Sequence, residues 1–80
     1  MKSYVVEFLV LDPCSGPVAL RQWLTKALPW TRELAVGGDE GVLRVHVRTS
    51  RPDLALAAGV ECGRLRDVVV KPEVATRAPR

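Results

Sequence analysis

The residues best placed to do chemistry lie in one short segment, Gly37-Gly38-Asp39-Glu40-Gly41. Its two carboxylates could help to hold a divalent metal, and its glycines could let backbone amides approach a phosphate. A further carboxylate, Asp12, closes an earlier apolar run. Nucleotidyl transfer needs a metal held by carboxylates on two elements and a cradle for the triphosphate, so this combination has to be weighed first.

Four letters of this segment match the GGDEF signature of diguanylate cyclases, but the rest of the chain does not support that chemistry. Gly41 stands where the cyclase signature has an aromatic residue, and no other segment supplies a phosphate site. The cyclase domain is also much longer than these 80 residues. All four letters are turn-forming, so we expect a glycine-permitted turn first, a ligand-binding loop second and a catalytic loop third.

The histidine and the cysteines give no alternative active site. His46 is the single histidine, and without placed partners it supports no Ser-His-Asp or Cys-His triad. Cys14 and Cys62 form no CxxC pair and are too few for a disulfide framework, so no zinc signature exists. We therefore expect no catalytic residue, no metal, no cofactor and no enzyme activity, and two free thiols in a reducing cytoplasm.

The composition is that of one small globular domain, with 48% hydrophobic and 26% charged residues. The net charge of +3 is not gathered into one run, so nucleic-acid binding is allowed but not indicated. No apolar segment approaches the roughly 20 residues of a membrane helix, and the N-terminal run lacks a convincing cleavage site. We expect a soluble cytoplasmic protein without membrane contact, for which self-association would supplement a small core.

Hydrophobic periodicity predicts four strands, over residues 4–11, 33–36, 42–49 and 65–71. A first helix is expected to be capped by Ser15 and to bury Leu20, Trp23, Leu24, Ala27 and Leu28. A second helix is expected to start at a capping box formed by Ser50 and Asp53 and to stop near Gly63. Residues 1–72 then form the domain, and residues 73–80 form a flexible tail.

This order of elements predicts an α+β, ferredoxin-like fold: a four-stranded antiparallel sheet with two helices on one face, and the first and third strands as central neighbours. The register that keeps Glu7 out of the core decides which residues face away from the helices, because an unpaired buried charge is costly. Glu7 can then pair across strands with basic residues. The residues expected beside it on this open face are Val5, Leu9, Leu11, Arg44, His46 and Arg48.

Three roles are open for that face. Three aliphatic side chains on one central strand, rimmed by charge, favour an interface with a second copy of the chain. A solvated face is the next alternative, since antiparallel sheets tolerate one. The basic stripe could also bind RNA, but sheets that do so use aromatic residues on their central strands, and the third strand here has none.

Nearly the whole chain resembles the effector-binding domain of the Lrp/AsnC family of transcription regulators. The resemblance rests on segments that occur in the family's order and with similar spacing: Leu28-Pro29, Val36-Gly37-Gly38-Asp39, Leu43-Arg44-Val45-His46-Val47 and Asp53-Leu54. Gly41 stands where the family usually has an Asp, and Glu40 where it often has an aromatic residue. The broader ACT class shares the topology, and one sequence does not separate the two.

The resemblance implies a module that pairs through its sheet, assembles further and binds an amino acid between subunits near the hairpin loop. It thereby implies a ligand site at Gly37, Gly38, Asp39 and Glu40. Without a preceding helix-turn-helix segment, the chain is expected to resemble a stand-alone version of that domain. The expected function is a non-catalytic, regulatory ligand-sensing and oligomerisation module. Its partners would be a second copy, an amino acid and a DNA-binding regulator. The alternative is a nucleic-acid- or protein-binding adaptor that uses the open face.

Overall fold

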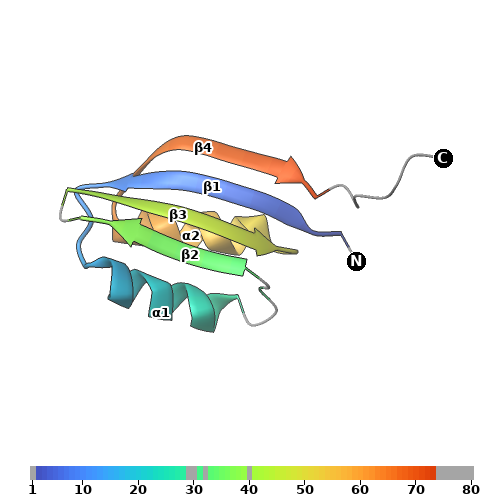
Figure 1. Ribbon diagram of the computed structural model, residues 1–80, viewed down its shortest axis with the longest axis horizontal. Helices are drawn as coiled ribbons and strands as arrows, with labels where there is room; N and C mark the ends of the chain where they lie inside the picture. The colour runs from blue at the N-terminus through green and yellow to red at the C-terminus, as the bar shows by residue number, and fades with distance from the viewer. Residues whose placement is uncertain (1, 29–30, 32, 40, 74–80) are drawn as a thin grey trace.

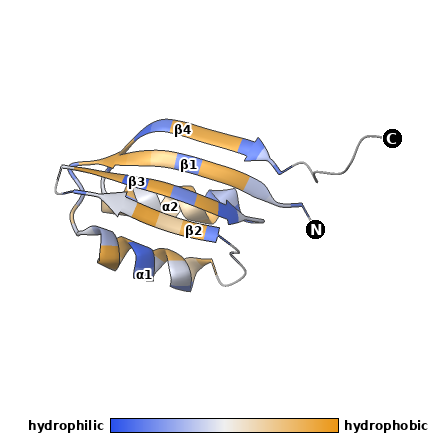
Figure 2. Ribbon diagram, viewed as in Figure 1, coloured by the Kyte–Doolittle hydropathy of each residue, from blue (hydrophilic) through white to orange (hydrophobic). Residues whose placement is uncertain are grey.

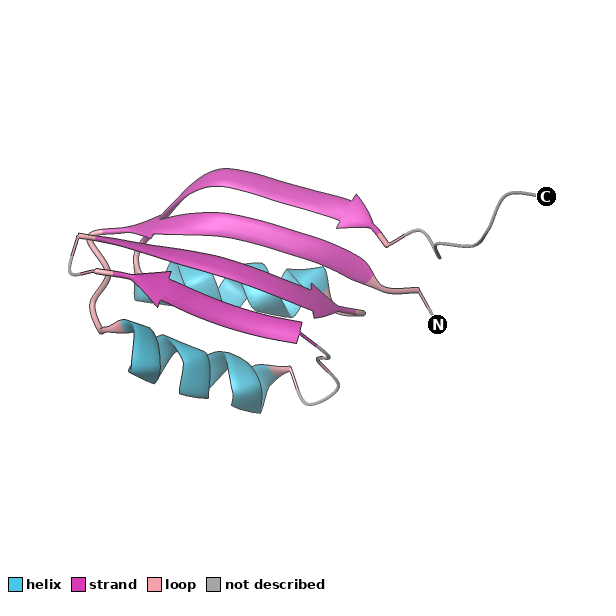
Figure 3. Ribbon diagram, in the orientation of Figure 1, coloured by secondary structure: helices cyan, strands magenta, loops and turns pink. Residues whose placement is uncertain are grey.

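The computed structural model describes residues 2–28, 31, 33–39 and 41–73. It is an α+β fold in which two helices lie on the same side of one antiparallel sheet (Figures 1 and 3). Pro29, Glu40 and residues 74–80 of the expected 73–80 tail lie outside the described residues. Glu73, the first residue of that tail, is described, and its backbone N–H donates to the Ser3 carbonyl at 2.8 Å. The elements are β1 (Tyr4–Leu11), α1 (Pro17–Ala27), β2 (Glu33–Gly38), β3 (Val42–Thr49), α2 (Pro52–Cys62) and β4 (Arg64–Pro72).

The four strands are ordered β2-β3-β1-β4, so the first and third strands are central neighbours, as predicted. β1 runs antiparallel to β3 on one side and to β4 on the other, and β2 forms a hairpin with β3. In the central pair, Phe8 lies opposite Val45 and Glu7 lies opposite His46. This register confirms that Glu7 faces away from the helices.

The core lies between the sheet and the two helices. Side chains alternate along a strand, so every second residue of β1 and β3 points to the helix layer. Twelve apolar side chains are buried there and form one cluster, and they come from four elements and one helix end. The cluster is Val6, Phe8, Val10, Leu20, Leu24, Leu28, Leu43, Val45, Val47, Ala55, Ala58 and Cys62.

The first helix differs from its prediction at two places. Its N-cap is Gly16 rather than Ser15, and no side chain caps it. Pro17 opens the helix, where its missing N–H costs nothing. Trp23 was expected in the core but is 40% exposed, because Leu20 and Leu24 form the stripe that meets the sheet and Trp23 lies at its margin.

The second helix also starts differently from the predicted capping box. Arg51 is its N-cap, and Ser50 does not cap it. The buried Thr49 accepts a hydrogen bond from the Arg51 backbone N–H at 3.0 Å, while the Arg51 guanidinium pairs with Asp53. The Thr49 hydroxyl thus holds the residue that precedes the helix, and no side chain caps the helix itself.

The two cysteines lie at the same end of the sheet, as their positions in the topology predict. The Cys14 backbone N–H donates to the carbonyl oxygen of Cys62 at 2.8 Å, and both thiols are free. Cys14 is exposed and Cys62 is buried beneath Ser15, whose hydroxyl lies 3.8 Å from its sulfur.

Candidate functional site

The open face is the side of the sheet opposite the two helices. β1 contributes three aliphatic side chains and Glu7 to it, and β3 contributes its three basic residues. The aliphatic side chains are only half-buried in the single chain. The six residues that the sequence predicted for this face, Val5, Leu9, Leu11, Arg44, His46 and Arg48, all lie on it.

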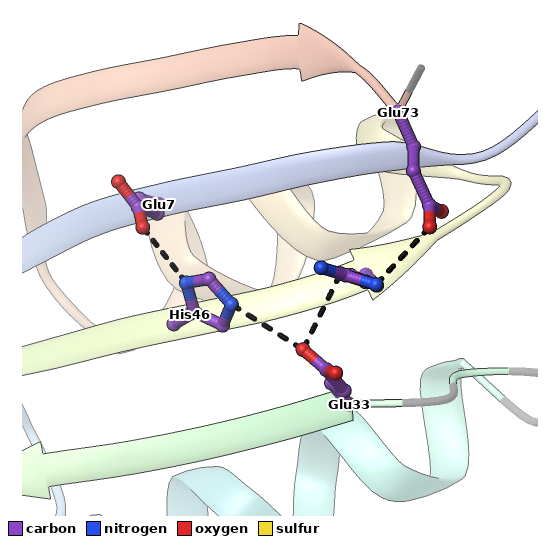
Figure 4. Close-up of polar contacts among 5 residues, drawn as sticks. Glu7, Glu33, His46 and Glu73 are labelled. Carbon is purple, nitrogen blue, oxygen red and sulfur yellow. Dashed lines mark hydrogen bonds and ion pairs between the residues drawn. The ribbon is translucent and has the colours of Figure 1, made fainter. Parts of the chain in front are cut away.

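A chain of ion pairs crosses the open face from β1 to β2 (Figure 4). The Nδ1 atom of His46 lies 2.8 Å from a Glu7 carboxylate oxygen, and its Nε2 atom lies 3.7 Å from Glu33. A carboxylate can only accept, so the short contact places a proton on Nδ1. Arg48 continues the chain, with contacts of 3.3 Å to Glu33 and 3.1 Å to Glu73.

These contacts change the electrostatic character of the face. The sequence predicted that Glu7 would pair across strands, and the His46 contact confirms it. Glu33 and Glu73 were not predicted as partners, although Glu33 lies opposite Arg48 in the β2–β3 register. Two of the three basic side chains on β3 therefore already have carboxylate partners.

Arg44 is the exception. Among the described residues it has no carboxylate within ion-pair distance, and its side chain is exposed. Its neighbour across the hairpin is Gly37, and the next open-face residue of β2 is Ala35. Because these two residues are small, they leave a groove of about 560 Å³ beside Arg44 and His46, which continues to Asp39 at the tip of the hairpin.

Two adjacent glycines at the end of β2, Gly37 and Gly38, have different roles. β2 extends to Gly38, two residues beyond the predicted end at Val36. Gly38 has a φ of 114°, and a Cβ atom there would lie 2.3 Å from the carbonyl oxygen of Val42. Gly37 has open space around the same position. The turn thus requires glycine at the second position but not at the first.

The turn uses part of its own hydrogen-bonding capacity. The Asp39 N–H donates to the Val42 carbonyl, and the Gly41 N–H donates to the Asp39 carboxylate, both at 3.1 Å. These two amides are therefore engaged within the loop. Of the four residues predicted to bind a ligand, Gly37, Gly38 and Asp39 line the groove, while Glu40 lies outside the described residues.

Asp12 does lie beside the hairpin, since its backbone N–H donates to the Gly41 carbonyl at 3.1 Å. Its carboxylate, however, pairs with Arg64 at 2.8 Å. Within the described part of the chain, no three His, Cys, Asp or Glu side chains are grouped closely enough to hold a metal ion. The cyclase-like letters thus occupy a neighbourhood in which one carboxylate is already paired.

Comparison with known proteins gives no family for this chain: no family model matches it, and neither does any curated protein. Over the described residues, no helix has both the length and the apolar character needed to cross a membrane. The interpretation of the open face rests on its own geometry.

Proposed function

We propose that this chain is a non-catalytic regulatory module that pairs with a second copy through the open face and senses a small amino-acid-like molecule there. The observation that carries the proposal is the half-buried aliphatic row on β1, Val5, Leu9 and Leu11, beside charged side chains that already contact one another. Such a face can be covered without leaving many unpaired ions in a dry contact. The proposal includes a ferredoxin-like ancestry of the Lrp/AsnC or ACT kind.

The chemistry of the groove favours a zwitterionic ligand. Arg44 offers a guanidinium without a carboxylate partner in the described part of the chain, which suits a ligand carboxylate in a bidentate contact. Asp39, at the other end of the groove, can accept from an ammonium group. The groove is open on the single chain, so a second copy laid over the face would enclose the ligand and desolvate both contacts.

The adaptor alternative, binding of nucleic acid to the same face, has less support. Single-stranded nucleic acid is held by cations and aromatic platforms. On the described open face no Phe, Tyr or Trp side chain is present, and His46 and Arg48 already contact carboxylates. A polynucleotide would have to displace those ion pairs and would gain no stacking.

Self-association is tested with Leu9→Glu, because Leu9 is central on β1 and faces away from the helices. In a covered face, the loss of a buried leucine costs about 2–5 kcal/mol, and the new charge would lie near Glu7 and oppose association further. Sedimentation analysis should show that the variant forms a smaller species than the wild type. Val18→Glu on the exposed surface of α1 is the matched control and should leave the mass unchanged.

Two outcomes would end this proposal for the open face. One is a wild-type chain that stays monomeric at all accessible concentrations. The other is a Leu9→Glu variant that folds, as judged by its circular dichroism, and retains the wild-type mass. Binding of a single-stranded oligonucleotide that moves the amide signals of β1 and β3 would instead support the adaptor role.

Ligand sensing is tested separately by a thermal-shift screen of the twenty amino acids. A ligand present at about 100 times its dissociation constant should stabilise the folded state by roughly 2.7 kcal/mol. It should also move the amide signals of Gly37, Gly38 and Asp39, and Arg44→Gln should abolish the effect while Arg21→Gln should not. If no amino acid shifts the melting temperature or these amides, the sensing role is wrong even if the chain self-associates.

A further inference from the structure

The free edge of β4 carries an unusual apolar stretch. Val68, Val69 and Val70 are consecutive, and they are 45%, 37% and 40% exposed. Figure 2 shows this stretch as the hydrophobic middle of β4, between hydrophilic ends. β4 is the last strand of the sheet, and within the described part of the chain nothing pairs with its outer edge. Such an edge is a template for pairing with another strand.

The exposure involves both faces of the sheet. Val69 lies opposite Glu7 and therefore on the open face, whereas Val70 lies opposite Val6 on the helix side. Val6 is fully buried by the helix layer, but Val70 on the neighbouring strand is not. A contact on one face alone would leave part of this stretch in water. An additional strand beside β4 would cover both faces at the same time.

The stretch has defined ends. Asp67 has a φ of 54°, and the β1–β4 register shifts between Glu7 and Leu9, which marks a bulge at that point. Bulges and prolines limit the length over which an edge strand can pair with another strand. Pro72 lacks an N–H and closes the other end. The free edge is therefore limited to Asp67, the three valines and Lys71.

We propose that a second copy of this chain pairs with β4 edge to edge, antiparallel, about a two-fold axis at Val69. The evidence is the charge pattern, in which an acid and a base stand at equal distances on the two sides of Val69. In this register Asp67 lies opposite the partner's Lys71, and symmetry repeats the pair. Asp67 is among the residues that line a groove on the open face, and Lys71 lies opposite Val5 on that face.

Other registers lack this match. A slip by one residue pairs an open-face residue of one copy with a helix-side residue of the other, which would put the helices of the two copies on opposite sides of the joined sheet. A slip by two residues places Asp67 opposite either the partner's Val69 or the partner's Glu73, so that the charge is left unpaired or repelled. The charges thus select the two-fold register centred on Val69, as cross-strand charge pairs do within sheets.

This contact does not compete with pairing through the open face. An axis perpendicular to the sheet leaves the helices of both copies on one side and the two open faces on the other. The two sheets become one continuous sheet with a larger open face. The edge contact is therefore independent of the proposed function, and either one can be correct without the other.

The first test is a disulfide trap with Val69→Cys in a Cys14→Ser background. Residues opposite each other in an antiparallel pair have Cα atoms about 4.5–5.5 Å apart, which a disulfide can bridge. Under mild oxidation at high protein concentration, this variant should form a covalent dimer. Val18→Cys in the same background, equally able to react but placed on α1, should not. Absence of the dimer, or equal dimer formation by the control, would overturn the proposal.

The second test probes the charges in the chain with its native cysteines. Lys71→Gln removes both symmetry-related pairs, and a cross-strand pair of this kind should make dimer formation about 2- to 30-fold weaker when lost twice. Lys26→Gln removes the same charge from exposed α1 and should have no effect. The Leu9→Glu substitution should leave the Val69→Cys trap intact, which separates a failure of this edge from a failure of the open face. A dimer unaffected by Lys71→Gln would refute the two-fold register.

Discussion

The two glycines of the hairpin give a sharp test, because they are adjacent in sequence but differ in surroundings. At Gly38 an added Cβ would lie 2.3 Å from the Val42 carbonyl oxygen and 3.0 Å from the Leu43 Cα atom. Ordinary contacts between such atoms begin near 3.5 Å. Both neighbours are backbone atoms of a central strand, so they cannot rotate away as a side chain would. At Gly37 no atom lies within 4 Å of the same position.

The expected cost of Gly38→Ala follows from two terms. Holding a non-glycine residue in a sparsely populated backbone region costs about 1–3 kcal/mol. Overpacking costs about 1–3 kcal/mol more. Alanine also lowers the conformational entropy of the unfolded chain, which offsets about 0.4–1 kcal/mol of this loss of stability. The net loss of unfolding free energy should lie between about 1 and 5.6 kcal/mol. A loss of about 3 kcal/mol, near the middle of that range, lowers the melting temperature of a domain this small by roughly 12–24 °C.

Urea denaturation followed by circular dichroism measures both variants, with a stabilising osmolyte in all samples if Gly38→Ala is marginal. Gly37→Ala should change the unfolding free energy by no more than about 0.5 kcal/mol, or should raise it slightly. The urea midpoints of the two variants should therefore differ widely, while the dependence of the unfolding free energy on urea concentration should be the same for both. If Gly38→Ala is neutral, or if both variants lose the same stability, the turn geometry described above is wrong.

Three further predictions concern the helices and acid stability. Gly59→Ala should lower stability by about 1 kcal/mol despite the better helix propensity of alanine, because its Cβ would lie 2.7 Å from the buried Phe8 ring; denaturation midpoints decide the sign. Thr49→Val should cost about 1 kcal/mol by removing the acceptor of the Arg51 N–H, and a stability unchanged from wild type would contradict that role. Hydrogen bonds from Arg51 hold the pKa of Asp53 below its usual 3.8, so this pair stabilises the fold above about pH 3.8, and the gain is lost as the pH falls through the lowered value. Asp53→Asn should therefore make acid unfolding less steep, by a small amount that added salt diminishes because both groups are exposed.

Which side chains of the first strand face the helices could be predicted from the sequence, because one residue decides it. Glu7 is a charge in an otherwise apolar run, and only one phase keeps it out of the core. That phase places Leu9 on the open face and Phe8 beneath the helices. The clean alternation of the third strand placed Glu7 among basic residues, and the structure shows that His46 is the one it pairs with.

Features that depend on how the elements pack in space were harder to predict from the sequence. Trp23 has the correct spacing for the core, but helical periodicity does not say how wide a stripe the sheet will cover. The helix starts were misplaced because Ser15 and Ser50 fit a capping pattern, whereas the backbone makes Gly16 and Arg51 the N-cap residues. The ion-pair partner Glu73 follows the last strand. Its proximity to Arg48 depends on the path of the backbone after β4, where the Glu73 N–H donates to the Ser3 carbonyl.

The strand order also has a consequence for how fast the chain folds. β1 is the first strand made, yet both of its neighbours, β3 and β4, lie several dozen residues further along the sequence. The β2–β3 hairpin is the one strand pairing in the sheet that closes over a short loop. Pairing strands that are distant in sequence requires a large loop to close, and the entropy cost of that closure comes before any stabilising contact forms. Such pairings therefore slow folding. The tight turn at Gly38 is therefore positioned to act as an early nucleus, on which the first strand docks late.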